Sequence, residues 1–473
     1  MSDDKQFHIG LIGLGVMGRN LALNMEEKGF PVAVWNRRFE VTESFLAENS
    51  GKRFGGAAQL SEFIGLLERP RRILLMIKAG NPVDQVLEQL QPLLEPGDIV
   101  MDGGNSWFED TQRREGLLRD KGLHYVGVGI SGGEEGARHG PSMMPGGSPE
   151  SYAEIRSVFE AITAQTEAGA CVTHVGPDGA GHFVKMVHNG IEYADMQLLA
   201  EVYDVMRRGL GLDESAMAEV FDMWNRGPME SFLVELTAQV LKVKEPQTGT
   251  PLVALVMDKA GQKGTGRWTV QAALEQGVAV PGISAAVDAR VLSSLKHERV
   301  AAVRSLGGDS PGLTGDRDAL IADLHGAIYA SRITAYAQGM ALIRSASDRY
   351  GWSVDLGEMA RIWKGGCIIR ARLLDTIRES YAGEEPANLM VSPVVSGQLL
   401  ELQGAWRRVV QAAVSVGIPL PVMSACLNYF DSYRTQRLPQ NLIQAQRDAF
   451  GAHTYERVDH PERGFVHSDW SGD

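Results

Sequence analysis

Short apolar runs alternate with amphipathic segments over the first 180 residues of the chain. The apolar runs are His8–Leu14, Val32–Trp35, Arg72–Ile77, Ile99–Asp102 and Tyr125–Ile130. Such alternation predicts βαβ units around a mostly parallel sheet. We therefore expect residues 1–180 to form an α/β domain.

The pattern changes to long stretches with helical spacing over residues 181–440. Examples are Ile191–Arg208 and Ala327–Arg344. This spacing predicts a large all-α domain. Within it, Glu219–Gly227 and Glu358–Gly366 share a Glu, a Trp and a Gly at matching positions, which suggests an internal duplication as a hypothesis.

Residues 441–473 are polar and rich in Gly, His and Arg, with too few apolar positions for a core. A C-terminal tail of this composition is either frayed or clamped onto another surface. The chain thus divides into an α/β domain, an all-α domain and a tail, in keeping with 473 residues, which exceed what one hydrophobic core usually organises.

Composition excludes several functional classes. The net charge is −13 and the Lys and Arg residues are scattered, which argues against a nucleic-acid partner. An anionic small substrate would need a local basic pocket. No run of about 18 uncharged apolar residues occurs, so no membrane insertion is expected. Met1–Gln6 is polar and acidic, unlike a secretory signal, and a cytoplasmic location is expected.

The three cysteines, Cys171, Cys367 and Cys426, are widely separated without Cys-x-x-Cys spacing. This argues against a disulfide framework or a zinc site, and we expect all three to be packing residues. Lys296–Val300 has a His and a Glu but lacks the second His of a zinc helix. No metal is predicted.

A glycine-rich turn follows the first apolar run. Gly13, Gly15 and Gly18 form the pattern G-x-G-x-x-G before the helix-like segment Arg19–Lys28. These glycines permit a tight turn, close approach of a pyrophosphate and close helix–strand packing. Glycines also serve ordinary turns, but the βαβ context favours a Rossmann-type dinucleotide site. Its contacts are expected at Gly13, Leu14, Gly15, Val16, Met17 and Gly18.

The end of the second apolar run indicates which dinucleotide binds. An NAD enzyme usually has an acidic residue there, whereas this chain has Asn36, Arg37 and Arg38. Guanidinium groups can bind a 2′-phosphate bidentately, so NADP is the predicted cofactor. The alternative is a turn with two solvated arginines.

A polar stripe marks the segment His182–Tyr193. On a helix, Lys185, His188, Asn189 and Glu192 share one face, opposite Val184, Val187 and Ile191. A Lys, a His, an amide and a Glu offer acid, base and hydrogen-bonding roles. An ordinary surface helix would also show such a stripe.

Two loops after predicted strands are further candidates. Asp102–Ser106 lies at the carboxyl edge of the sheet, where Asn105 could reach a ligand. Gly127–Gly136 supplies Ser131 and neighbouring backbone N–H groups that suit a carboxylate. Either loop could be a simple turn.

Together with Lys263–Trp268, Gly366–Arg370 and Phe450–Tyr455, these segments resemble the 6-phosphogluconate dehydrogenase family along nearly the whole chain. The resemblance implies a homodimer that converts 6-phospho-D-gluconate and NADP⁺ to D-ribulose 5-phosphate, carbon dioxide and NADPH. It places this reaction in the pentose phosphate pathway, without a metal.

The resemblance also implies roles for individual residues. Lys185 is the expected general base and Glu192 the expected acid. The expected substrate-binding residues are Asn105, Ser131, Gly132, Gly133, His188, Asn189, Tyr193, Lys263, Thr265 and Arg290, with Arg447 and His453 reaching the active site of the partner subunit. The cofactor set adds Lys78, Ala79 and Asn105 to the residues named above.

Two positions depart from the family pattern. The family often carries Ala at position 15 and Ser or Thr at position 38, where this chain has Gly15 and Arg38. Neither change argues against NADP binding, since Gly is common in dinucleotide folds and Arg38 adds a positive charge.

Two rival functions remain open. A β-hydroxyacid dehydrogenase acting on a small unphosphorylated acid would share the glycine pattern and the Lys-x-x-x-Asn helix. It would have no use for the second helical unit, the tail or the set of Lys263, Thr265 and Arg290. A non-catalytic NADPH-binding sensor would not need an intact Lys185 and Glu192.

Overall fold

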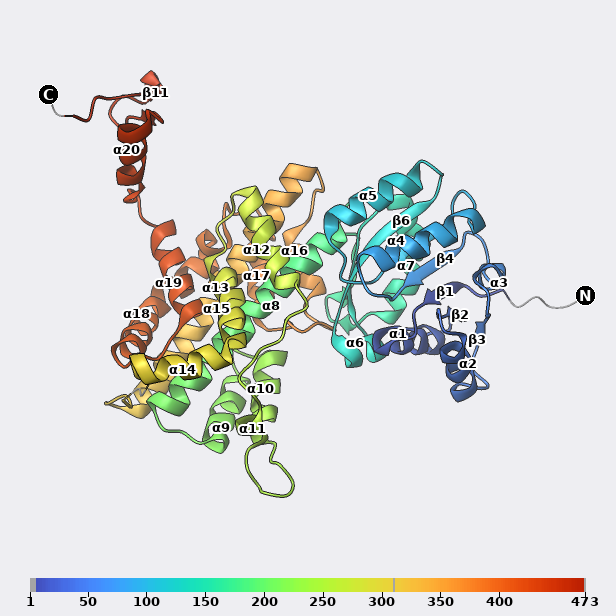
Figure 1. Ribbon diagram of the computed structural model, residues 1–473, viewed down its shortest axis with the longest axis horizontal. Helices are drawn as coiled ribbons and strands as arrows, with labels where there is room; N and C mark the ends of the chain where they lie inside the picture. The colour runs from blue at the N-terminus through green and yellow to red at the C-terminus, as the bar shows by residue number, and fades with distance from the viewer. Residues whose placement is uncertain (1–5, 309–310, 472–473) are drawn as a thin grey trace, which may run out of the picture. The chain divides into compact units, whose positions relative to one another are not determined.

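The computed structural model describes residues 6–308 and 311–471 (Figure 1). Residues 1–5, which make up most of the segment used to judge a secretory signal, lie outside the described residues. The chain forms two compact units, Met1–Cys426 and Leu427–Asp473.

The first unit begins with a seven-stranded sheet in the order β3-β2-β1-β4-β5-β6-β7. All neighbouring strands are parallel except β6 and β7. The five predicted strands are confirmed, whereas β3 and β7 were not predicted. The strands are β1 Ile9–Ile12, β2 Val32–Trp35, β3 Phe54–Gly56, β4 Arg72–Leu75, β5 Ile99–Asp102, β6 His124–Ser131 and β7 Ser142–Pro145.

Helices cover both faces of this sheet. In β4, Leu74 joins one hydrophobic cluster while Ile73 and Leu75 join the other, because side chains alternate along a strand. The first cluster includes residues of α1, α2, α6 and α7, and the second includes residues of α3, α4 and α5. The helices are α1 Val16–Glu27, α2 Phe39–Glu48, α3 Leu60–Gly65, α4 Asn81–Leu90, α5 Phe108–Arg119, α6 Gly133–His139 and α7 Pro149–Ile162, with the short helix η1 at Gln91–Leu93.

A two-stranded hairpin, β8 Gln165–Thr166 and β9 Gly169–Ala170, precedes the helical part of the first unit. Its helices are α8 Ala180–Asp204, η2 Val205–Gly209, α9 Glu214–Trp224, α10 Phe232–Lys242, α11 Leu252–Leu255, α12 Thr265–Gln276, α13 Pro281–Ser294, α14 Lys296–Leu306, α15 Arg317–Tyr350, α16 Leu356–Ile362, α17 Leu373–Ser380, η3 Leu389–Val391 and α18 Pro393–Ser415. The next helix, α19 Pro421–Tyr433, begins in the first unit and ends in the second. The predicted fold class, a Rossmann-type α/β domain followed by a large all-α domain, is confirmed.

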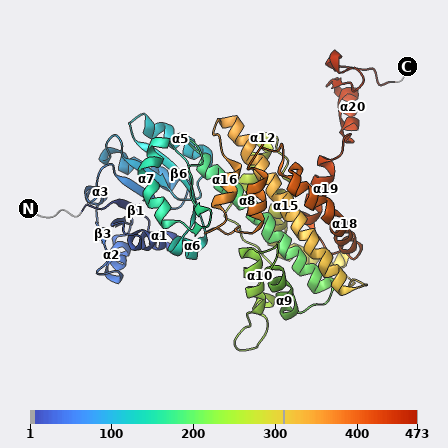
Figure 2. The same ribbon diagram turned by 180° about the vertical axis from the view of Figure 1, so that it is seen from behind.

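The helical part is organised around α8 and α15, which pack against each other while α15 also packs against α18 (Figure 2). Asp195 of α8 and Arg332 of α15, both almost fully buried, form an ion pair of 2.8 Å. The two segments of the duplication hypothesis occupy α9 and α16 with the turns that follow them. The first segment comes after α8 and the second after α15, and the duplication stays a hypothesis.

The second unit contains α20 (Gln440–Gly451), β10 (Tyr455–Glu456), η4 (Pro461–Arg463) and β11 (Phe465–Val466). Buried Asp448 organises it by accepting hydrogen bonds from the backbone N–H groups of Thr454 and Ser468 and from the rings of His467 and Trp470, at 2.7–3.0 Å. Burial opposes ionisation of Asp448, but these donors outweigh it and lower the pKa of the carboxyl. The described tail is therefore tied together by polar contacts.

Candidate active site

The residues predicted to bind the cofactor follow the carboxyl ends of parallel strands. Gly13 follows β1, Asn36 follows β2, Lys78 follows β4 and Asn105 follows β5. β1 and β4 lie side by side in the sheet, where the strand order reverses. Open α/β sheets bind ligands in the crevice outside such a point.

The glycine turn fits a pyrophosphate. Gly13 has φ +104°, a conformation that L side chains rarely adopt. A Cβ atom on Gly18 would clash with the carbonyl oxygen of Gly13, so α1 can pack close to the turn only with glycine there. No atom lies within 4 Å of the position a Gly15 Cβ would take, and Gly15 precedes α1 without a capping side chain. The N-terminus of α1 is therefore open to an anion.

Two neighbouring cavities meet at this turn. One, of about 430 Å³, is lined by Asn36, Arg37 and Arg38. The other, of about 730 Å³, is lined by Val16–Gly18, Lys78–Ala79, Asn105 and, from the helical part, Lys263. Four residues line both cavities: Gly15, Met76, Ile77 and Lys78. The two cavities together suit a long ligand that places a phosphate group beside Arg37 and Arg38.

Sequence reasoning missed other lining residues of these cavities. They are Ile12, Trp35, Met76, Ile77, Pro82, Gln85, Val86, Gln89, Gly103, Gly104, Ile130 and Trp268. Trp35 and Ile77 stand next to the predicted site residues Asn36 and Lys78, and Gln85 and Gln89 are one helical turn apart on α4. These positions were the available signal.

Lys185, His188 and Asn189 of the polar stripe are buried and Glu192 is partly exposed, which excludes the ordinary surface helix. Lys185 is 6% exposed, and its Nζ donates to Asn189 Oδ1 at 2.8 Å. His188 is fully buried, with Nδ1 3.3 Å from Lys185 Nζ and Nε2 3.2 Å from Ser131 Oγ. Glu192 Oε2 lies 3.9 Å from His188 Nδ1. The structure thus brings together the predicted base, the predicted acid and part of the predicted carboxylate site.

Burial shifts the pKa values of this group in opposite directions. It lowers the pKa of Lys185, although the Glu192 charge acts the other way. It raises the pKa of Glu192 against the charges of Lys185 and Arg290. Burial and the Lys185 charge hold the pKa of His188 well below its ordinary value, so His188 is neutral. Both shifts favour the forms that a base and an acid need, a neutral amine at Lys185 and a protonated carboxyl at Glu192.

The predicted phosphate set lies around the start of α12. Thr265 is buried at the first position of that helix, and Lys263 is exposed just before it. The Arg290 guanidinium lies 3.5 Å from the centre of the Tyr193 ring, and a Cβ on Gly266 would touch the same ring. Tyr193 of α8 therefore contacts both α12 and α13, and the Arg290 guanidinium makes this place positively charged.

The loop with Ser131, Gly132 and Gly133 rests on the segment after α16. A Cβ on Gly132 would clash with the carbonyl oxygen of Gly366, which also accepts a hydrogen bond from Ser142 N at 2.9 Å. Cys367 follows, fully buried, and burial raises the pKa of its thiol to about 12. All three cysteines are buried and free. The start of the Gly366–Arg370 motif thus packs against the candidate carboxylate loop.

Arg447 and His453 belong to the second unit. Both line a cavity of about 980 Å³ together with Leu442, Phe465 and other tail residues. Arg447 Nη1 donates to Gln444 Oε1 at 2.9 Å.

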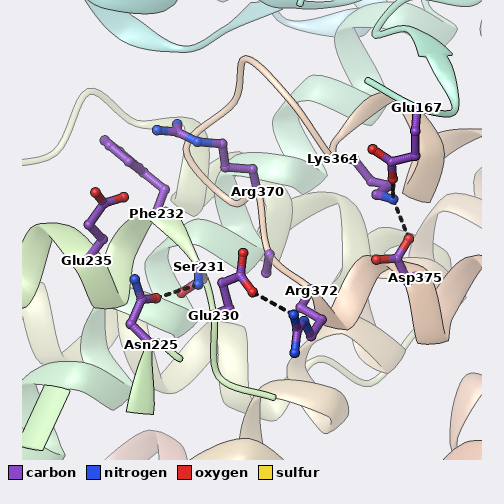
Figure 3. Close-up of a pocket in the computed structure, with 11 residues that line it drawn as sticks. Glu167, Asn225, Glu230, Ser231, Phe232, Glu235, Lys364, Arg370, Arg372 and Asp375 are labelled. Atoms are coloured by element: carbon purple, nitrogen blue, oxygen red, sulfur yellow. Dashed lines mark hydrogen bonds and ion pairs between the residues drawn. The ribbon is translucent and has the colours of Figure 1, made fainter. Parts of the chain in front are cut away.

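A separate cavity of about 470 Å³ in the first unit contains none of the predicted site residues (Figure 3). Its charges are largely compensated: Lys364 contacts Glu167 and Asp375, and Arg372 pairs with Glu230 at 3.0 Å. Such a network needs no ligand to balance it.

Within residues 6–308 and 311–471, no three or more His, Cys, Asp or Glu side chains are arranged to hold a metal ion. No helix in that part of the chain is both long and apolar enough to cross a membrane.

Comparisons with known proteins cover both parts of the chain. Residues 8–176 match the NAD binding domain of 6-phosphogluconate dehydrogenase, and residues 181–470 match the C-terminal domain of the same enzyme. The chain is 55% identical over 466 residues to 6-phosphogluconate dehydrogenase, decarboxylating, of Synechococcus elongatus, covering 98% of each chain. It is 49% identical over 464 residues to the NADP(+)-dependent, decarboxylating 6-phosphogluconate dehydrogenase of Bacillus subtilis, again covering 98% of each.

A solved structure agrees with these relatives. Plasmodium falciparum 6-phosphogluconate dehydrogenase, solved in its apo form, with its cofactor NADP+ and with its substrate 6-phosphogluconate, superimposes with a TM-score of 0.94. It is 42% identical, and the match covers 98% of this chain and all of that one. The resemblance predicted from the motifs is confirmed, and the chain belongs to the 6-phosphogluconate dehydrogenase family.

Proposed function

We propose that this chain catalyses the oxidative decarboxylation of 6-phospho-D-gluconate to D-ribulose 5-phosphate and carbon dioxide, with NADP⁺ as oxidant. The observation that carries the proposal is the buried Lys185, which donates to Asn189 and lies beside neutral His188. The names of the Synechococcus and Bacillus relatives support the same reaction.

Lys185, as a neutral amine, takes the proton from the C3 hydroxyl of the substrate. Bound NADP⁺ supplies the acceptor for the hydride that leaves C3. The product is a 3-keto acid whose carboxylate is β to the new carbonyl. Carbon dioxide leaves while protonated Lys185 donates its proton to the carbonyl oxygen, and an enediol forms. The lowered pKa of Lys185 favours the neutral amine that starts this sequence.

Glu192 then donates a proton to C1 of the enediol while Lys185 takes back the proton of the adjacent enediol hydroxyl, which completes the ketose. This role requires a protonated carboxyl, and burial raises the pKa of Glu192 in that direction. His188 is neutral and 3.2 Å from Ser131, so it serves as a hydrogen-bonding group rather than as a charge.

The remaining residues bind the two ligands. Asn105, His188, Asn189 and the loop Ser131–Gly133 hold the substrate's carboxylate and hydroxyls. Its phosphate is held by Tyr193, Lys263, Thr265 and Arg290. The cofactor's 2′-phosphate is held by Asn36, Arg37 and Arg38, and Lys78 and Ala79 lie beside the nicotinamide half. The cofactor residues named here, together with Asn105 and Lys263, line the two cavities at the glycine turn, which fits these roles.

A homodimer with exchanged tails completes the proposal. In the described part of residues 431–471, Asp448 is the single buried residue, while Phe450 and Phe465 are 75% and 71% exposed. A tail without an apolar core gains stability by covering these side chains on another surface. Arg447 and His453 would then reach the substrate of the partner subunit. The test is the mass of the full chain and of a chain ending at Pro439 by light scattering, where a monomeric full chain would refute the exchange.

The decisive experiment follows absorbance of NADPH with 6-phosphogluconate and either NADP⁺ or NAD⁺, with gluconate as the control and no added metal. Rapid reduction of NADP⁺ by the phosphorylated acid alone is expected. Activity on unphosphorylated acids would instead support the small-acid alternative. Lys185→Met should still bind NADP⁺ but lose turnover, and appreciable turnover by that variant would remove Lys185 from the role of base.

A further inference from the structure

A buried carboxylate holds the loop that carries Asn105. Asp102, at the end of β5, is fully buried. Its Oδ1 accepts a hydrogen bond from Gly104 N at 2.9 Å, and its Oδ2 accepts bonds from Ser106 Oγ at 2.6 Å and Tyr125 OH at 3.0 Å. The residues on both sides of Asn105, Gly104 through its backbone and Ser106 through its hydroxyl, are thereby tied to the end of β5.

The same residue contacts the helix of Lys185 through its carbonyl group. His182 Nε2 lies 3.0 Å from the Asp102 carbonyl oxygen, and His182 Nδ1 lies 2.7 Å from Thr111 Oγ1. A carbonyl oxygen only accepts, so Nε2 carries a hydrogen. Burial lowers the pKa of His182, which keeps the ring neutral, and Nδ1 is then the acceptor of the Thr111 hydroxyl. One tautomer satisfies both contacts.

The position of Lys185 depends on that of His182, because both lie on α8 and α8 packs closely against β6. The two residues are three apart on α8 and share a face. A Cβ on Gly127 would lie 2.7 Å from His182 Nδ1, and a Cβ on Gly129 would lie 2.5 Å from Lys185 Cβ. The small residues of β6 therefore let α8 lie directly against the sheet, where a rotation of the helix has little room.

Arg114 connects a third segment to the centre formed by Asp102, Thr111 and His182. It is 1% exposed, donates to the Gly80 carbonyl oxygen at 3.1 Å and forms two bonds of 2.9 Å with Asp84. Its Nη1 is 3.7 Å from Asp102 Oδ2. The loop after β4, with Lys78 and Ala79, is thus linked to the same carboxylate.

We propose that neutral His182, held by the Asp102 carbonyl and the Thr111 hydroxyl, is a positioning residue that sets Lys185 against the loops Lys78–Gly80 and Gly103–Asn105. His182 does not itself exchange a proton during turnover. The inference rests on the proposed role of Lys185. Its consequence is that loss of the His182 contacts slows hydride transfer without weakening the cofactor site.

The test uses graded variants of His182. His182→Leu removes both hydrogen bonds and should lower kcat by about 10- to 100-fold, since a displacement of about 1 Å can cost that much. KM for NADP⁺ should stay within about twofold of the original value, because the residues that hold the cofactor are not displaced. His182→Gln restores a donor toward Asp102 and should recover part of the loss. His174→Gln is the matched control, since His174 contacts a backbone carbonyl at 2.8 Å outside this centre.

The kinetic isotope effect distinguishes a specific effect of His182 on hydride transfer from a general loss of structure. With substrate deuterated at C3, His182→Leu should show a larger isotope effect on kcat than the unaltered chain, because hydride transfer becomes slower than the other steps. An unchanged kcat, or a lower kcat with an unchanged isotope effect, would overturn the proposal. If His182→Leu does not fold, Thr111→Val, which removes one of the two contacts, should show the same larger isotope effect at a smaller loss of kcat.

A readout independent of turnover distinguishes this inference from the proposed function. In protein labelled with ¹⁵N-histidine, the signals absent from His182→Gln belong to His182, and they should report a neutral ring protonated at Nε2. A ring protonated at Nδ1, or a charged ring, would overturn the inference even in an active enzyme. An inactive unaltered chain with the expected tautomer would refute the proposed function instead.

Discussion

Replacing Glu201 by Gln should change how the stability of the chain depends on pH. Glu201 lies on α8 and is 2% exposed. Its carboxyl oxygens accept hydrogen bonds from Val422 N at 2.8 Å and Met423 N at 3.0 Å, at the start of α19. Burial raises the pKa of Glu201 to about 7, although the two backbone donors favour the charged form.

The magnitude follows from that pKa. A value of about 7 in the folded chain against an ordinary 4.5 corresponds to about 3 kcal/mol, because each pKa unit is worth about 1.4 kcal/mol. The folded pKa is the higher one, so the stability that neutral Glu201 contributes is fully present below about pH 4.5. It is lost as the pH rises through about 7. The amide introduced by Glu201→Gln does not ionise, so the contribution of position 201 to the free energy of unfolding would not change between about pH 4.5 and 7.

The assay is urea unfolding of both chains at about pH 5, 6, 7 and 8. The free energy of unfolding of Glu201→Gln minus that of the unaltered chain should become more positive with pH, by up to about 3 kcal/mol. Glu401→Gln, at an exposed position of α18, is the matched control. A difference for Glu201→Gln that stays constant from about pH 5 to 8 would refute the reasoning, since the carboxyl would then keep one charge state throughout.

Three further predictions test other parts of the chain. Arg332→Met should lower the free energy of unfolding by about 3–5 kcal/mol, because it leaves Asp195 charged and buried without its partner; adding Asp195→Leu should recover part of that loss in urea unfolding, and no recovery would contradict the pairing. Arg38→Ser should raise KM for NADP⁺ by about tenfold and leave KM for NAD⁺ unchanged in steady-state kinetics, because one charge toward the 2′-phosphate is lost; an equal rise for both would place Arg38 elsewhere. Asp448→Asn should speed amide hydrogen exchange over residues 452–471, since an amide cannot accept all four hydrogen bonds; unchanged exchange would mean that other contacts hold the tail.

The strands were predictable where both sheet faces are covered. Residues such as Ile73, Leu74 and Leu75 are all fully buried, so the run is continuously apolar and stands out in the sequence. β3 and β7 were missed for physical reasons. Phe54–Gly56 contains two glycines, and Ser142–Pro145 is a short edge strand that ends in proline. β3 pairs only with β2 and β7 only with β6, so each lies at an edge of the described sheet.

The site was predictable as a list of residues but not as an environment. Helical spacing placed Lys185, His188, Asn189 and Glu192 on one face, yet spacing alone could not decide whether that face meets water. Burial of the face depends on Gly129, whose missing side chain lets Lys185 lie against β6. His182 continues the same stripe one turn earlier, and it was left out because its partners, Thr111 and the Asp102 carbonyl, are distant in sequence.

The charged groups buried along α8 differ in the partners that the fold gives them. Asp195 has the Arg332 guanidinium, a close opposite charge, at 2.8 Å. Among the described residues, Lys185 has no carboxylate within 4.0 Å, and Glu192 has only neutral His188 at 3.9 Å. Burial therefore acts on these two groups without a close opposite charge, lowering the pKa of one and raising that of the other. In the proposed reaction, Lys185 gains and loses a proton in each turnover, and a close ion pair would oppose this by favouring the charged amine.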